Sequence, residues 1–145
     1  MNIPERAFLG TILKYNHLIN DTFIKVDQLE EEKHKVLFRE IRRLVSEGKP
    51  VDRVTLALSP NIQGIGGLSY VNELLTYADD KKFEDYEKLV FESWREREKQ
   101  NILTSARLQD WPIEKVLDEL DKINQAIVDD HKPINELLVE LYEAP

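Results

Sequence analysis

Three of the chain's five glycines, Gly64, Gly66 and Gly67, lie within four residues of one another in the segment NIQGIGGLSY. Glycines ahead of a helix can expose backbone N–H groups that bind phosphate. A P-loop needs a lysine after its last glycine, whereas Gly67 is followed by Leu68 and Ser69. The dinucleotide fingerprint needs G-x-G-x-x-G after a strand, and the order here is G-x-G-G with no strand predicted before it. The pattern instead predicts a structural turn, in which Gly64 ends one turn and Gly66 and Gly67 permit positive φ and close helix packing.

The other side chains that could do chemistry lack the neighbours that catalysis or metal binding requires. His17, His34 and His131 have no partner at helical spacing and no acidic cluster at zinc-like spacing, and we expect each to be exposed to solvent. The serines show no nucleophile elbow. The chain has no cysteine, which excludes a thiolate nucleophile, a disulfide framework and Cys-ligated zinc. We therefore expect no catalytic residue, no metal site and no cofactor site within this chain.

Hydrophobic spacing predicts an all-α fold, because apolar residues recur at helical intervals and no segment alternates with a period of two. The first half reads as short helices over residues 4–15, 30–47, 52–58 and 68–78, with Asp52 as an N-cap and Gly48 as a helix stop. The predicted buried faces are Phe8, Leu9, Ile12 and Leu13, then Val36, Leu37, Ile41, Leu44 and Val45, then Leu68, Val71, Leu74 and Leu75. These helices together predict a small helical head.

The second half predicts a long αα-hairpin. A helix of about 26 residues, about 39 Å long at 1.5 Å per residue, ends at the segment QDWP, since proline disfavours helix in the residue before it. Its apolar face carries Phe83, Tyr86, Val90 and Trp94, which we expect to join the hairpin to the head. The next helix spaces its apolar residues as a coiled-coil seam does. These residues, which we expect to pair two subunits, are Ile113, Val116, Leu117, Leu120, Ile123 and Ile127.

Each of the two tryptophans and the last segment leaves a choice. Trp94 fits either the core or the hairpin seam, and Trp111 at the hairpin tip either folds back as a cap or anchors an interface. The segment PINELLVELYEAP predicts a short amphipathic helix that is marginal alone in water and needs a groove on this chain or on another. Its docking face is Ile134, Leu137, Leu138 and Leu141. The chain then stops without a folded finish, so we expect a fragment cut at a domain boundary.

Charge and hydropathy exclude other classes of protein. The net charge is −8, and ten acidic but only three basic residues follow from Asp110 onward. Duplex DNA is bound through clustered cations, and only the segment REIRR, with Arg39, Arg42 and Arg43, offers a short cluster. A solvated helix face is the preferred interpretation of that cluster, and we expect little direct DNA binding. No apolar run approaches membrane-spanning length, which predicts a cytoplasmic protein without a membrane partner.

Four stretches, taken in order, resemble the N-terminal domain of DnaB-type replicative DNA helicases: ERAFLGTIL, HKVLFREIRRLVSEGKPVDRVTL, IGGLSYVNEL and DYEKLV. The specific part is G-K-P-V-D-x-V-T-L followed shortly by I-G-G-x-x-Y. The final INELLVELYE resembles the linker helix that joins this domain to the ATPase domain. Only ALSPNIQG separates the two motifs, and the family usually has a longer helix and loop there. The resemblance therefore indicates a divergent member, of the kind borne by a phage or plasmid.

The resemblance implies a division into a helical head over residues 1–80, a pairing hairpin over residues 81–129 and a linker over residues 130–145. Hairpins would pair between subunits, and six subunits would form a collar described as a trimer of dimers. The collar would dock primase and a helicase loader, and Tyr70 and Trp111 are the residues we expect to contact primase. Unwinding would belong to an ATPase domain outside this chain, which would bind ATP and Mg²⁺. This fragment itself would not be an enzyme.

Two alternatives stay open from the sequence. A free-standing helical adaptor, such as a helicase loader or inhibitor, would also suit an acidic chain without catalytic residues. A DNA-binding domain would use Arg39, Arg42 and Arg43 and would bind DNA in a salt-sensitive manner.

Overall fold

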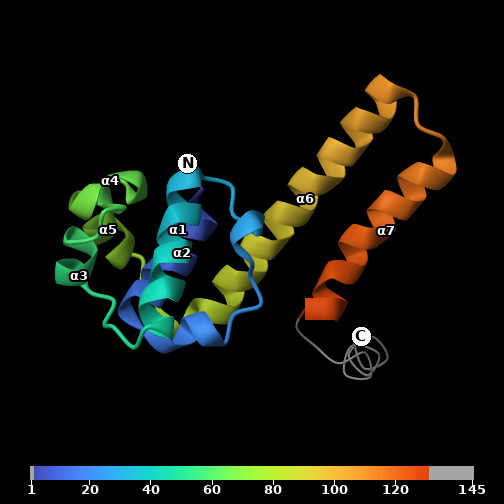
Figure 1. Cartoon of the computed structure of the whole chain (residues 1–145). Helices are drawn as coiled ribbons and strands as arrows, with labels where there is room; N and C mark the ends of the chain where they lie inside the picture. Colours follow the sequence, from blue (N-terminus) through green and yellow to red (C-terminus); the bar gives the residue numbers. More distant parts are fainter. Residues whose placement is uncertain (1, 131–145) are drawn as a thin grey trace. The chain divides into compact units, whose positions relative to one another are not determined.

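The computed structural model describes the backbone of residues 2–130 and the side chains of residues 2–125, and all regular structure in that range is helical. The elements are α1 (Ile3–Lys14), η1 (Asn16–Asn20), η2 (Val26–Gln28), α2 (Glu32–Ser46), α3 (Arg53–Ala57), α4 (Ile62–Ile65), α5 (Gly67–Leu75), η3 (Asp80–Lys82), α6 (Phe83–Gln109) and α7 (Ile113–Asp130) (Figure 1). The predicted all-α class is confirmed. None of the helices within residues 2–130 combines the length and the apolar composition that a membrane crossing requires.

Side-chain caps and glycines fix where the first helices begin and end. The Asn2 side chain accepts the backbone N–H of Glu5 at 3.1 Å and so caps α1. The carboxylate of Asp52 accepts the backbone N–H of Thr55 at 2.8 Å and caps α3. Gly48, at φ 71°, ends α2 in the left-handed region. The predicted cap at Asp52 and the predicted stop at Gly48 are therefore confirmed.

The chain divides into two compact units between Trp94 and Arg95, so that α6 contributes its first part to one unit and its second part to the other. Trp94 contacts the Phe91 ring with 5.5 Å between the ring centroids, which places it with the first unit. The predicted functional division into residues 1–80, 81–129 and 130–145 stays a prediction, because the boundary between two compact units need not be the boundary between two functions.

The core of the first unit is built from α1, α2, α5 and the start of α6. The Phe8 ring stacks on Phe38 at 6.2 Å and on Phe83 at 5.5 Å between centroids. Phe38 is fully buried although the predicted face of α2 omitted it, whereas Val36 and Val45 are only half-buried. The largest completely enclosed side chains are Phe8, Phe38, Leu9, Ile12, Ile24, Leu29, Leu37, Ile41, Leu44, Leu56, Ile65 and Leu74. The buried face of α2 therefore includes Phe38, and the two half-buried valines lie at the edges of that face.

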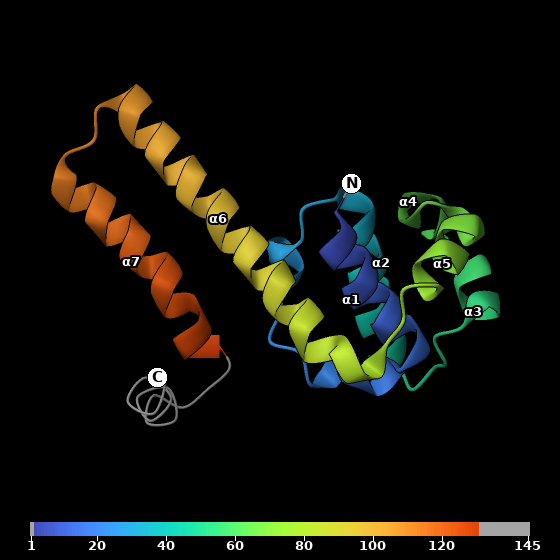
Figure 2. The same cartoon turned by 180° about the vertical axis from the view of Figure 1, so that it is seen from behind.

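The glycine segment contains a short helix, α4, that the sequence did not predict. Gly66 and Gly67 have φ values of 110° and 82°, as the sequence predicts. Gly64, however, lies inside α4 and does not end a turn. This helix of four residues is stabilised by Ile65, which is completely buried, and by packing on α2 and α5. Figure 1 and Figure 2 both show α3, α4 and α5 gathered on one side of the head.

The second unit, as far as its residues are described, is the later part of α6 followed by α7. The turn between them contains Asp110 at φ 54°, and the backbone N–H of Trp111 donates to the carbonyl oxygen of Ala106 at 3.0 Å. The two helices run antiparallel in both views (Figures 1 and 2). Arg95 on α6 donates to the side-chain oxygen of Asn124 on α7 at 2.8 Å. The predicted hairpin is therefore present.

Candidate functional site

A buried chain of three polar side chains links three helices of the head. The carboxylate of Glu5 on α1 lies 2.7 Å from Nδ1 of His34 on α2, and Nε2 of His34 lies 2.6 Å from the hydroxyl of Tyr70 on α5. Glu5 and Tyr70 are 1% and 7% exposed, and His34 is completely enclosed. The expectation that His34 is exposed is therefore wrong. Its physical reason is that α2 turns His34 towards α1, where a carboxylate and a phenol satisfy both ring nitrogens.

The protonation of Tyr70 in this chain follows from burial. Burial raises the pKa of Tyr70 to about 12, so that the phenol keeps its proton. With His34 neutral and protonated at Nδ1, the Nδ1–H donates to Glu5 and the Tyr70 hydroxyl donates to Nε2. Glu5 also accepts the backbone N–H of Glu30 at 2.7 Å, just before α2. One carboxylate thus joins α1 to the start of α2 and, through His34, to α5.

The order carboxylate, imidazole, hydroxyl is also that of a catalytic triad. The three residues could therefore be catalytic if the hydroxyl could act as a nucleophile. A nucleophile must reach its substrate. The Tyr70 hydroxyl instead points at His34 from within the core, and burial favours its neutral form. We therefore interpret the three residues as a structural link. Among the described residues, no cluster of three histidine or acidic side chains is arranged to hold a metal ion.

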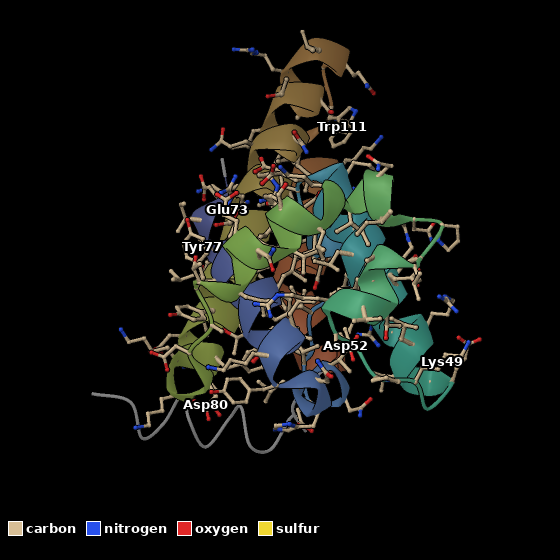
Figure 3. All side chains as sticks on the ribbon, turned by 90° about the vertical axis from the view of Figure 1, so that its left-hand side faces the viewer. Lys49, Asp52, Glu73, Tyr77, Asp80 and Trp111 are labelled. Carbon is tan, nitrogen blue, oxygen red and sulfur yellow. The ribbon has the colours of Figure 1, made fainter. Side chains whose placement is uncertain are left out.

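Cationic side chains cover the Tyr70 ring. Nζ of Lys33 lies 3.9 Å from the ring centroid, and the Arg6 guanidinium lies 5.3 Å from it. Arg6 also pairs with Glu73 at 2.6 Å, and Glu73 projects beside Tyr77 (Figure 3). Tyr70 therefore lies in the packing of the head, under these two cations. Its predicted contact with primase stays a prediction.

The structure divides the predicted pairing residues of α7 by exposure. Ile113 and Leu117 are 72% and 62% exposed, and Ile123 is buried. Val116 and Leu120 are half-buried. The side chain of Ile127 lies outside the described residues, as do Ile134, Leu137, Leu138 and Leu141 of the predicted linker helix.

The last part of α6 adds two exposed apolar side chains that the sequence reasoning did not assign to pairing. Leu103 is 40% exposed and Leu108 is 75% exposed. We call these two, together with Ile113 and Leu117, the exposed hairpin row. No periodic signal joins the two α6 residues, because positions five residues apart lie about 140° apart around a helix.

Trp111 lies at the hairpin tip, half-buried against its own neighbours. Its Nε1–H donates to the side-chain oxygen of Gln109 at 3.0 Å, and Nζ of Lys115 lies 4.2 Å from the ring centroid. Of the two alternatives for this residue, these contacts favour a cap that folds back on the tip. Its predicted contact with primase stays a prediction.

The short basic cluster of α2 is largely occupied within the head. Arg43 pairs with Glu40 and, at 2.6 Å, with Glu47. Arg39 lies 4.0 Å from Glu32. Within this cluster Arg42 alone lacks an acidic partner among the described residues, whereas a nucleic-acid backbone is bound through several cations in a row.

These features define an all-α domain that combines an internally linked head with a hairpin carrying an exposed apolar row. The model of the DnaB-like helicase N-terminal domain matches residues 3–92, and this chain belongs to that family. Among solved structures, the chain resembles a DnaB-like replicative helicase that was determined together with its interactions with primase. That likeness has a TM-score of 0.69 and 26% sequence identity, and it covers 97% of this chain but 35% of the helicase chain. The chain thus spans about a third of the length of that helicase.

Proposed function

We propose that this chain is the collar domain of a hexameric replicative DNA helicase, in which it holds subunits together and docks primase or a helicase loader. Its place in the DnaB-like family and its likeness to a helicase studied with primase support this proposal. Unwinding, with ATP and Mg²⁺, would reside in an ATPase domain outside these residues. The chain itself would act as a scaffold.

The single observation that carries the proposal is the exposed hairpin row. Four large apolar side chains, Leu103, Leu108, Ile113 and Leu117, are between 40% and 75% exposed on one unit. Large apolar side chains exposed on a domain can be covered in an interface, and each Å² of apolar surface removed from water contributes about 25 cal/mol. A two-fold pairing of hairpins covers the same row on both copies at once, which is the commonest symmetry of protein dimers.

The proposal predicts that Leu117→Asp lowers self-association without lowering the stability of the fold. Leu117 is 62% exposed, so that a carboxylate there stays hydrated in the free chain but is buried without a partner in a dimer. We expect the dissociation constant, measured by sedimentation velocity, to rise at least about tenfold, which corresponds to 1.4 kcal/mol. Ile123→Asp should instead lower the stability of the fold, because it places a carboxylate at a buried position.

Lys122→Asp is the matched control on α7. Lys122 is exposed and pairs with Glu119 and Asp118 at the surface, where ion pairs contribute little. This control changes the net charge more than Leu117→Asp does. A loss of self-association seen only in Leu117→Asp would therefore result from the change in the exposed hairpin row and not from charge. A wild-type chain that stays monomeric at millimolar concentration, or equal effects of the two variants, would contradict the proposed pairing.

The role of the parent protein has a separate test in its coding sequence. We expect the motif G-x-x-x-x-G-K-[ST] downstream of Pro145, since the nucleotide-binding loop of a motor domain requires it. If the reading frame closes without this motif, the free-standing adaptor becomes the better explanation.

A further inference from the structure

A groove on the head is lined in part by two arginines of the basic cluster of α2, Arg42 and Arg43. It has a volume of about 510 Å³, within the range of ligand pockets, and lies between η1 and the C-terminal half of α2. Its lining residues are Ile19, Asn20, Arg42, Arg43, Val45 and Ser46. All of them belong to the first unit, so the groove does not depend on the hairpin.

The two guanidinium groups of the groove differ in what neutralises them. Arg43 pairs with Glu40 and Glu47, so its charge is balanced within the head. Arg42 donates to the carbonyl oxygen of Ile24 at 3.3 Å and lies 4.7 Å from the Phe38 ring centroid. Among the described residues these are its contacts, and neither is an anion. Arg42 therefore brings an unbalanced positive charge to the groove.

The two contacts of Arg42 also orient it. One N–H donates to Ile24, and the central guanidinium carbon lies over the ring of Phe38, which is completely buried. A guanidinium has five N–H donors, so four stay available to an incoming acceptor. Since the side chain is already held in place, binding costs less conformational entropy than it does for a free arginine.

The rest of the groove determines which anion fits. Ile19, 2% exposed, and the half-buried Val45 supply an apolar lining beside the charge. A nucleic-acid backbone needs several cations in a row, whereas here Glu40 and Glu47 accompany Arg43. A single carboxylate next to an apolar side chain matches one free guanidinium next to an apolar lining, and guanidinium binds carboxylate through two parallel hydrogen bonds.

We propose that this groove binds an acidic peptide segment of a partner protein. A glutamate or aspartate of the segment pairs with Arg42, and a neighbouring apolar side chain of the segment covers Val45 beside the buried Ile19. The inference goes beyond the collar function, because it places a second docking site on the head and holds whether or not the hairpins pair.

The test uses the whole chain labelled with ¹⁵N and a synthetic peptide, acetyl-GSELEG-amide, titrated in an NMR experiment. We expect the amide signals of Asn20, Val45 and Ser46, which line the groove, to shift on binding. A matched peptide, acetyl-GSQLQG-amide, should bind at least about tenfold more weakly, because the charged hydrogen bonds to Arg42 are lost. Shifts located elsewhere, or equal binding of the two peptides, would overturn the proposal.

Two variants of the chain complete the test. Arg42→Gln should weaken binding of the acidic peptide at least about tenfold, and Arg42→Lys should restore only part of it, since lysine keeps the charge but not the fork. Arg39→Gln is the matched control, because Arg39 lies on the same helix but does not line the groove. Equal loss in Arg42→Gln and Arg39→Gln would overturn the proposal. So would displacement of the peptide from the groove by a 20-nucleotide oligothymidine, which would assign the groove to nucleic acid.

Discussion

A single imidazole, that of His34, connects three helices of the head. Both of its ring nitrogens have partners, Glu5 at 2.7 Å and Tyr70 at 2.6 Å, and the ring is completely enclosed. A buried polar group that loses its partner costs about 1–3 kcal/mol, because water cannot replace the lost hydrogen bond. The contribution of these residues to stability therefore depends on all three being present together.

The hydroxyl of Tyr70 provides a direct test of this link. Tyr70→Phe leaves Nε2 of His34 without its donor, and we expect the free energy of unfolding at pH 7 to fall by about 1–3 kcal/mol in urea denaturation. Tyr86→Phe is the matched control, because Tyr86 is half-buried on α6 and its hydroxyl makes no hydrogen bond with the described residues. If both variants lost the same free energy of unfolding, the hydrogen bond between Tyr70 and His34 would make no specific contribution to stability.

The pH dependence of Tyr70 gives this prediction a second measurement. Burial raises its pKa from 10 to about 12 in the folded chain, so the fold favours the neutral phenol. The resulting stability is fully present below about pH 10, the ordinary pKa of tyrosine, and is lost as the pH rises through 12. The difference between wild type and Tyr70→Phe should therefore narrow between pH 10 and 12. A difference that stays constant over this range would contradict the assigned protonation of the phenol.

At the scale of elements, α1 and α5 approach so closely that a glycine is required between them. A Cβ atom built on Gly10 would lie 2.0 Å from the carbonyl oxygen of Leu74, which no side-chain movement can relieve. Helix α1 makes its closest packing with α5, and these helices also carry Glu5 and Tyr70. Gly10 thus controls the spacing of two of the three residues in the buried link.

We expect Gly10→Ala to lower the free energy of unfolding by more than about 3 kcal/mol, because overpacking between backbones forces the helices apart. Gly64→Ala is the matched control within a helix. Its added Cβ would meet only the side chain of Val36 at 3.4 Å, and alanine favours helix over glycine by about 1 kcal/mol. Thermal denaturation of both variants compares them directly. Similar melting temperatures would show that α1 and α5 do not pack as closely as described.

At the scale of the whole molecule, the two units differ in how much apolar surface each encloses. Almost every buried apolar side chain belongs to the first unit, whereas Ile123 is the buried one among the described residues of the second. A unit with few enclosed apolar groups opens more readily. The hairpin therefore depends for its stability on what covers its exposed row.

Hydrogen exchange at two protein concentrations measures this dependence. We expect amides of residues 95–125 to exchange several times more slowly at a concentration well above the dissociation constant than well below it, since pairing stabilises the hairpin by mass action. Amides of α1 and α2 serve as the internal control and should not change. Uniform exchange rates at both concentrations would indicate that the hairpin is stable alone.

The sequence by itself determined the longer helices of this protein and its family, but not the short helix α4. Helical spacing of apolar residues is a local property, so the all-α class, the Asp52 cap, the Gly48 stop and the positive φ of Gly66 and Gly67 could be predicted before any tertiary contact was known. The resemblance to DnaB-type helicases, carried by two motifs in order, is confirmed by the family match.

Only the tertiary structure decided which side chains meet. Glu5, His34 and Tyr70 are 29 and 36 residues apart, and no periodicity links a lone histidine to partners on two other helices. The same holds for Gly10 against Leu74, and for the division of α7 into a buried Ile123 and an exposed Leu117. Helical spacing shows which apolar residues lie on the same face of a helix. Whether that face meets its own chain or solvent depends on how the helices are placed in space.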